Sequence, residues 1–291
     1  MAKTSTREEE HRGATQAVKQ GIETRKHVLK SNRAHRASGN MREVLAFGAA
    51  SLGALVLTGI LSLASADISQ PYLDTIATEP ADFFQPFFGD IPPLLAVGVI
   101  VVIGAASLGF LVSRGWFTIL PERGLKQGLV IAAIAGTLLS IAAILVEASG
   151  LIRFDDDLNV PLPWSLLFYP AVAYVVEILL HVLPLALLLA PLALLLAALG
   201  PRTKARSADR LLWTCIVIVA FLEPLLQLSQ VEGNAASSGT EAWLFGHVLA
   251  ANLAQLYLFR RYGFVSMLMF RLAYYAWWHV LWGELRLIWL F

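Results

Sequence analysis

Seven long runs of apolar residues constrain the fold of this chain more than any other feature. A helix that crosses a bilayer needs about 20 predominantly apolar residues to span a hydrocarbon core of ~30 Å. Runs of this kind cover residues 44–66, 92–113, 128–148, 165–199, 211–230, 242–259 and 264–283. Only 15% of the 291 residues are charged, which excludes an ordinary water-soluble globular protein. We therefore predict an all-α fold, a polytopic transmembrane helix bundle of about seven spans in the cell membrane.

The fourth run is longer than a perpendicular crossing requires. It contains Pro170, Pro184 and Pro191, which predict a kinked or tilted span. Two crossings are the alternative, but they would place the basic cluster at 202–210 outside the cell, against the usual bias of Lys and Arg. We therefore expect one crossing here.

The distribution of Lys and Arg predicts the orientation of the bundle. Residues 1–42 hold ten of the 22 basic residues, whereas the first loop, 67–90, carries acidic residues and no basic ones. With the N-terminus in the cytoplasm, 19 of the 22 basic residues fall on the cytoplasmic side. We expect a basic, mostly solvated tail over 1–42, a three-span scaffold over 43–150 and a four-span region with a polar site over 151–291. The lipid bilayer is the expected partner, and nucleic acid is not, because topology explains the basic tail.

Polar residues within the spans separate the last four runs from the first three. The first three carry small residues, which favour close helix packing. Ionisable groups inside a span are costly and usually face the interior of a bundle. In the last four spans they recur at helical spacing, on one face of each helix. The polar residues, in chain order, are Glu177 and His181; Glu223 and Gln227; His247, Asn252 and Gln255; Arg271, Tyr275 and His279.

These polar faces are expected to converge. Counted from the span ends, four of these residues fall within a layer ~10 Å thick: Glu177, Glu223, His247 and His279. Arg271 lies nearer the inner membrane face. We predict that Glu177, His247 and His279 share a cavity. The catalytic candidates are Glu177, His181, His247 and His279. The supporting polar residues are Glu223, Asn252, Arg271 and Tyr275. We expect Glu223 to be a structural group, and Arg271 to be either a counter-ion for a carboxylate or a side chain that extends to the inner membrane face.

Four segments of the C-terminal half resemble the motifs of a known family. They are YVVEILLH at 174–181, WLFGH at 243–247, LYLFRRYG at 256–263 and HVLWG at 279–283. Together they are similar to the Glu-Glu-x-x-x-Arg, Phe-x-x-x-His and His-x-x-x-Asn motifs of the CPBP family, the intramembrane proteases of CAAX prenyl processing and bacteriocin processing. The resemblance covers roughly 165–283. It implies a peptidase that cleaves a membrane-protein substrate, in which Glu177 activates a water held by His247 and His279.

The chain departs from these motifs at several positions, so the resemblance also fits a catalytically inactive member of the family. Counting from Gly263, Arg271 fits the position of the last His as well as His279 does. The other departures are Val176 for the first Glu, His181 for Arg, Trp243 for Phe and Gly283 for Asn.

Two hypotheses from other classes remain open. The chain is a non-catalytic subunit of a larger membrane assembly, in which the polar stripes lock the helices together. Alternatively, it is a haem protein, because His247 and His279 on neighbouring spans could serve as axial ligands. The sequence lacks the phosphate-binding Gly-x-x-x-x-Gly-Lys and the zinc-binding His-Glu-x-x-His. It therefore assigns no metal or cofactor.

Overall fold

The computed structural model describes residues 41–63, 91–121, 123–152, 160, 162–198, 201–231 and 238–290. The expectations for the basic tail fall almost wholly on residues 1–40, outside these ranges. The chain divides into two compact units, Met1–Leu45 and Ala46–Phe291. The helix packing below concerns the second unit, and the proposed internal boundary at residue 150 stays a prediction.

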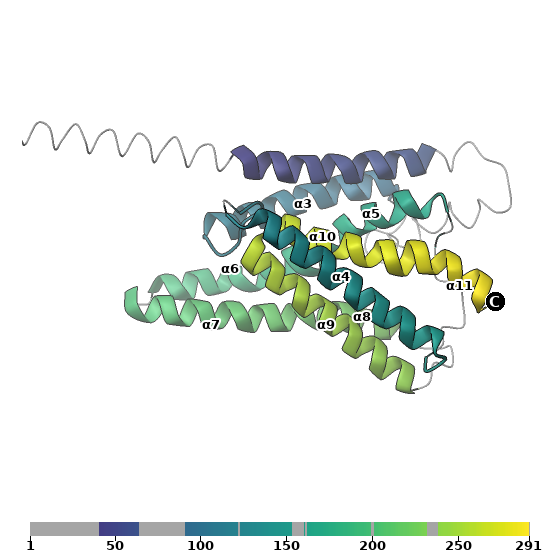
Figure 1. Ribbon diagram of the computed structural model, residues 1–291. Helices are drawn as coiled ribbons and strands as arrows, with labels where there is room; N and C mark the ends of the chain where they lie inside the picture. Colours follow the sequence, from purple (N-terminus) through teal and green to yellow (C-terminus); the bar gives the residue numbers. More distant parts are fainter. Residues whose placement is uncertain are drawn as a thin grey trace, which may run out of the picture. The chain divides into compact units, whose positions relative to one another are not determined.

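The described residues form helices and connecting turns, without a strand, which confirms the predicted all-α helix bundle (Figure 1). Four of the helical elements (η1, α6, η2 and α11) continue the one before without a break, so that they join into two longer rods. The elements are the helix Met41–Leu63, α3 (Pro93–Ser113), α4 (Leu125–Ala148), α5 (Ser165–Val176), η1 (Glu177–Val182), α6 (Leu183–Ala198), α7 (Pro201–Ala220), α8 (Leu222–Val231), α9 (Ser238–Tyr262), α10 (Phe264–Tyr275), η2 (Ala276–Trp282) and α11 (Gly283–Trp289).

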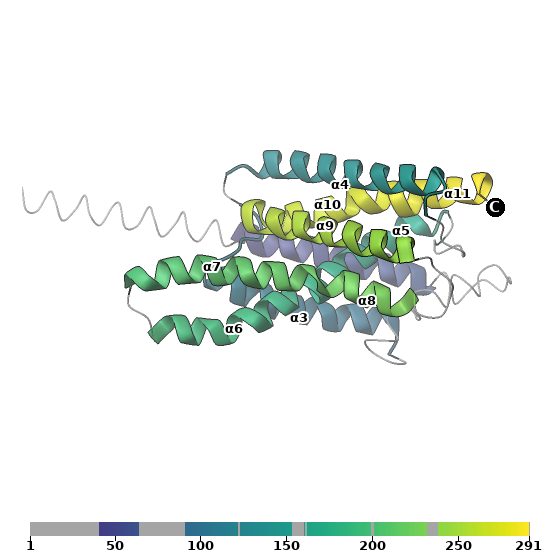
Figure 2. The same ribbon diagram turned by 90° about the horizontal axis from the view of Figure 1, so that it is seen from below.

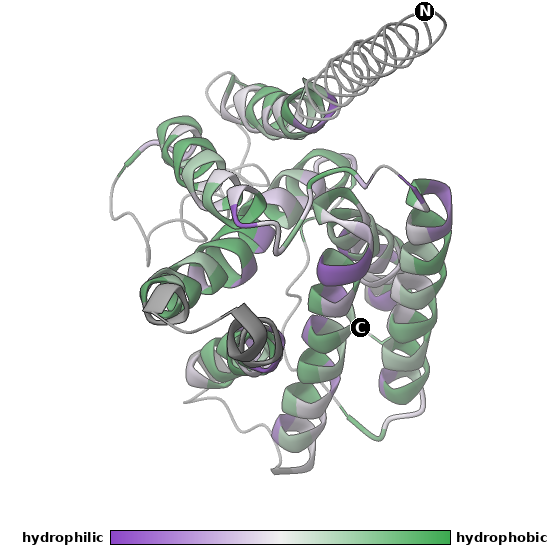
Figure 3. Cartoon of the chain, turned by 90° about the vertical axis from the view of Figure 1, so that its left-hand side faces the viewer, coloured by the Kyte–Doolittle hydropathy of each residue, from purple (hydrophilic) through white to green (hydrophobic). Residues whose placement is uncertain are grey.

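Six described helices are long and apolar enough to cross a membrane, and they coincide with the first six predicted spans. Apolar residues predominate along them (Figure 3). The seventh predicted span corresponds to the rod from Phe264 to Trp289, which is not among the six because Arg271, His279 and several Tyr and Trp residues make it less apolar. This rod packs against α4, α5 and α9. A seventh crossing stays a prediction.

The fourth run is one continuous helical rod, as expected for a single crossing. It passes from α5 through the π-helical η1 into α6, with Pro170 inside α5 and Pro191 inside α6. In the apolar 18-residue window of its candidate span, Ser165–Leu194, 67% of the residues are buried, the largest share among the six. This helix is therefore the central one, and its polar residues face protein rather than lipid.

Glycines on α4 bring this helix into close contact with α10. A Cβ added to Gly128 would lie 2.6 Å from Ser266 Oγ, and one added to Gly136 would overlap the carbonyl oxygen of Phe270. In contrast, a Cβ on Gly109 of α3 would meet no atom within 4 Å. Small residues allow two membrane helices to approach closely, which accounts for the tight packing of α4 against α10. The three-span scaffold over 43–150 stays a prediction.

The connections α3–α4, α6–α7 and α9–α10 lie at the same end of the second unit (Figures 1 and 2). At this end the backbone N–H groups of Phe264 and Val265 donate to the carbonyl oxygens of Thr118 (3.0 Å) and Ile119 (3.2 Å). Which end faces the cytoplasm stays a prediction.

Candidate functional site

The central rod changes from α-helix to π-helix at Glu177. π-Helical turns are rare and frequently occur at functional sites. The side chains of Glu177 and His181 are fully buried, and the imidazole Nδ1 lies 2.8 Å from Glu177 Oε2. The two residues that the sequence placed on one helix face are therefore in direct contact.

A proline places the second carboxylate. Pro224 has no backbone N–H, so the carbonyl oxygen of Ala220, four residues earlier, loses its helical donor. The helix breaks between α7 and α8 at Phe221, and the side-chain amide of Asn252 donates to the Ala220 oxygen instead (3.1 Å). Glu223 follows in the first turn of α8, where the helix dipole favours a negative charge.

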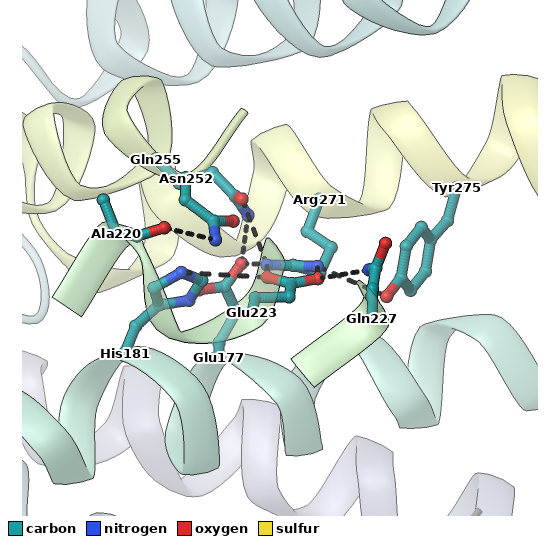
Figure 4. Close-up of polar contacts among 9 residues, drawn as sticks. All are labelled: Glu177, His181, Ala220, Glu223, Gln227, Asn252, Gln255, Arg271 and Tyr275. Carbon is teal, nitrogen blue, oxygen red and sulfur yellow. Dashed lines mark hydrogen bonds and ion pairs between the residues drawn. The ribbon is translucent and has the colours of Figure 1, made fainter. Parts of the chain in front are cut away.

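Arg271 of α10 joins the two carboxylates (Figure 4). Its Nε donates to Glu177 Oε1, and its Nη1 and Nη2 donate to the two oxygens of Glu223, each at 2.8 Å. The contact with Glu223 is the bidentate geometry in which guanidinium–carboxylate pairs are strongest. Arg271 is thus the counter-ion that the sequence predicted. Residue counting placed the Arg271 backbone nearer the inner membrane face. Its long side chain nevertheless brings the guanidinium to both glutamates.

Amide side chains complete the cluster. Gln255 of α9 donates to Glu177 Oε1 and accepts from Arg271 Nη2 (3.1 Å). Gln227 donates to Glu223 Oε1 at 3.4 Å. Each carboxylate oxygen of Glu177 and Glu223 therefore has at least one hydrogen-bonding partner. We call Glu177, His181, Glu223, Gln255 and Arg271 the central network; Gln227, Asn252 and Tyr275 lie at its edge (Figure 4).

One nitrogen of the central network has no hydrogen-bonding partner in the part of the chain that the structure describes. His181 Nε2 is buried and lies 3.9 Å from Glu223 Oε2, beyond hydrogen-bonding distance. With a neutral imidazole the four ionisable groups sum to one negative charge, and with an imidazolium they sum to zero. His181 therefore sits between two carboxylates, with one nitrogen committed to Glu177.

His247 and His279 have aromatic neighbours. His247 stacks on Trp243, with ring centroids 4.5 Å apart, and its Nε2 lies 2.9 Å from the Tyr274 hydroxyl. His279 stacks on Tyr169, with centroids 4.4 Å apart, and meets Tyr275 edge-on. These contacts differ from those of Glu177, which are with His181, Gln255 and Arg271. The cavity predicted for Glu177, His247 and His279 thus stays a prediction, and so does a haem between the two histidines, which a visible absorption spectrum would detect.

A second buried ion pair escaped the sequence analysis. Arg286 Nε donates to Glu147 Oε1 at 2.7 Å, and the indole N–H of Trp282 donates to Glu147 Oε2 at 2.7 Å. Both charged residues are 2% exposed. The available signal was Glu147 itself, an acidic residue in the last turn of an otherwise apolar span. We call Glu147, Trp282 and Arg286 the end clamp, because it ties η2 and α11 to α4.

Comparisons of the chain with protein-family models, with curated proteins and with solved structures give no match. The resemblance to CPBP proteases therefore rests on the four sequence segments alone. Within the described residues, no group of three or more His, Cys, Asp or Glu side chains is arranged to hold a metal ion.

Proposed function

We propose that this chain is a non-catalytic integral membrane subunit whose central network holds its transmembrane helices in register. The observation that carries the proposal is the position of Arg271 between Glu177 and Glu223, with three hydrogen bonds of 2.8 Å to their oxygens. Side chains that hydrogen-bond across helices hold membrane bundles together. Here they come from η1, α8, α9 and α10, which lie far apart in the sequence.

The hydrogen-bonding partners of the Glu177 carboxylate favour a structural role. A general base needs a lone pair within hydrogen-bonding distance of the water that it activates. Arg271 and Gln255 both donate to Glu177 Oε1, and His181 occupies Oε2. Protein groups thus take three of the roughly four lone-pair positions of this carboxylate, which disfavours a bound catalytic water.

The resemblance to CPBP proteases, taken as a resemblance, agrees with this proposal. If Arg271 stands in the position of the last His, the group that would hold the water in the family is here a guanidinium. A guanidinium carries five N–H donors and no acceptor, and it is not deprotonated in proteins. It can neither bind a metal ion nor accept a proton, so the chain would be an inactive member.

A cleavage assay tests the proposal. Wild-type protein and Glu177→Gln would be incubated in liposomes with a set of transmembrane peptides, and cleavage products would be identified by mass. We expect no products from either protein, and a lower midpoint of thermal unfolding for Glu177→Gln because a neutral amide pairs poorly with Arg271. Products from the wild type that disappear in Glu177→Gln would overturn the proposal.

An intramembrane peptidase is the second candidate, and His181 is the observation that favours it. Its Nδ1 contacts Glu177, while Nε2 has no hydrogen-bonding partner among the described residues. A carboxylate that orients an imidazole whose other nitrogen acts as the base is a recurrent catalytic arrangement. In this case His181→Gln would abolish cleavage in the same assay while largely preserving the thermal midpoint.

A further inference from the structure

Exposed basic side chains gather at the end of the second unit where the α3–α4 connection meets the joint between α9 and α10. The hydrogen bonds of Phe264 and Val265 to this connection hold the two segments together. The start of α4 also packs against the last residue of α9, since a Cβ on Gly128 would lie 2.6 Å from Tyr262 Cβ. The exposed cationic residues of these segments, which we call the basic patch, are Arg114, Arg123, Lys126 and Arg261.

The basic patch lacks acidic partners within the described ranges. No described carboxylate lies within 4.0 Å of its cationic nitrogens, whereas the buried Arg271 and Arg286 are paired at 2.8 and 2.7 Å. The neighbouring Arg260 has Asp209 at 3.9 Å. The four charges of the basic patch therefore attract an anionic group from outside the described protein.

Aromatic residues place the basic patch at the level of lipid headgroups. The Arg114 guanidinium lies 5.4 Å from the centre of the Phe110 ring, and Phe110 meets Trp116 edge-on. Arg261 lies 5.7 Å from the centre of the Tyr262 ring. Trp and Tyr are enriched at the boundary between hydrocarbon and water, where their rings contact both phases. Basic residues beside such rings are at the depth of the phosphate groups.

We infer that the basic patch binds the headgroups of anionic phospholipids. Juxtamembrane Lys and Arg are attracted to anionic lipids, and guanidinium groups can hold phosphate oxygens in bidentate geometry. Two segments that meet in the fold present four cations over one part of the surface, so that they can act on the same few lipids. This binding is independent of the central network and goes beyond the proposed function.

Lipid retention tests the inference. The full chain would be purified in micelles that contain equal amounts of phosphatidylglycerol and phosphatidylcholine with matched acyl chains, and the retained lipids would be counted by native mass spectrometry. The patch variant replaces Arg114, Arg123, Lys126 and Arg261 with Gln. A control with the same change in net charge replaces four tail residues, Lys19, Arg25, Lys26 and Lys30, with Gln.

We expect wild type and the tail control to retain phosphatidylglycerol over phosphatidylcholine by roughly tenfold, and the patch variant to lose most of this preference. Salt of about 1 M should also remove the preference in the wild type, because the Debye length falls to about 3 Å. An unchanged preference in the patch variant would overturn the inference. Loss of the preference for phosphatidylglycerol in the tail control alone would also overturn it. The same holds for a preference that does not respond to salt.

Discussion

Two buried arginines on the last helical rod are held by carboxylates in different ways. Arg271 lies between two glutamates and joins α10 to η1, α8 and α9. Arg286 pairs with Glu147 and joins α11 to α4. Both pairings are buried, but the first lies midway along several helical rods and the second lies within a turn of two helix ends. The comparison suggests that depth and the number of partners decide how much structure depends on one charge.

The two clusters also differ in the number of carboxylates that surround each arginine. The end clamp pairs one carboxylate with one guanidinium, and the indole N–H of Trp282 binds the remaining carboxylate oxygen. The central network has two carboxylates for one guanidinium, so the single positive charge of Arg271 faces two negative charges. Loss of Arg271 would therefore leave two buried carboxylates, whereas loss of Arg286 would leave one.

The largest effect is expected from Arg271→Met. Removing one partner of a buried ion pair typically costs 3–5 kcal/mol, because the other charge stays buried and unpaired. We expect a loss of about 4 kcal/mol or more in the free energy of unfolding, or failure to fold. Denaturant unfolding in detergent measures this, with the exposed Arg123→Met as the control. A change no larger than that of the control would contradict the proposed role of Arg271.

Arg286→Met sharpens the comparison. Glu147 lies in the last turn of α4, so we expect a small rearrangement of the helix end to bring the unpaired carboxylate to water. We therefore expect a smaller loss, about 2–3 kcal/mol. The two variants would be measured side by side. If Arg286→Met lost as much free energy of unfolding as Arg271→Met, or more, depth would not explain the difference between the two arginines.

Gly136→Ala tests the α4 surface that supports both clusters. The added methyl would overlap the carbonyl oxygen of Phe270, one residue before Arg271, and would push α10 away from α4. Overpacking of this kind costs about 1–3 kcal/mol. Gly109→Ala, where the Cβ has open space, is the matched control and should lower stability by much less. Equal thermal midpoints for the two variants would argue against close contact of α4 with α10.

The smallest effect is expected from Trp282→Phe. The change keeps an aromatic ring in the end clamp and removes the N–H that donates to Glu147. Loss of one hydrogen bond of this kind lowers the free energy of unfolding by about 1–2 kcal/mol. Because Arg286 still compensates Glu147, a loss as large as that of Arg286→Met would mean that the indole, not the guanidinium, holds the clamp together.

The fold followed from the sequence because a bilayer admits few solutions. Length and apolarity were enough to locate the first six helices. The pairing of Glu177 with His181 followed from residue spacing, and the role of Arg271 as counter-ion followed from the chemistry of its residue type. These features depend on neighbours within one helix, or on a charge that must find a partner.

The stripe of Arg271, Tyr275 and His279 also followed from helical spacing, since Tyr275 contacts both of the other residues. The π-helical turn that begins at Ala276 could not be obtained from the residue pattern. Nor could the contacts of His279 with Tyr169 and of His247 with Tyr274, because the partners lie on other helices. The end clamp was missed because its members belong to elements separated by more than a hundred residues.

A double-mutant cycle on Glu223 and Arg271 tests the central claim most directly. The free energy of unfolding would be measured for wild type, Glu223→Leu, Arg271→Met and the double variant, in the same detergent. If the central network is a structural lock, Arg271→Met is strongly destabilised because it leaves two buried carboxylates, whereas Glu223→Leu loses the bidentate pair but leaves Arg271 bonded to Glu177. The double variant leaves one buried carboxylate, so its loss is smaller than the sum of the two single losses, with a coupling energy of about 2 kcal/mol or more. Additive losses, or single variants as stable as the wild type, would contradict the account.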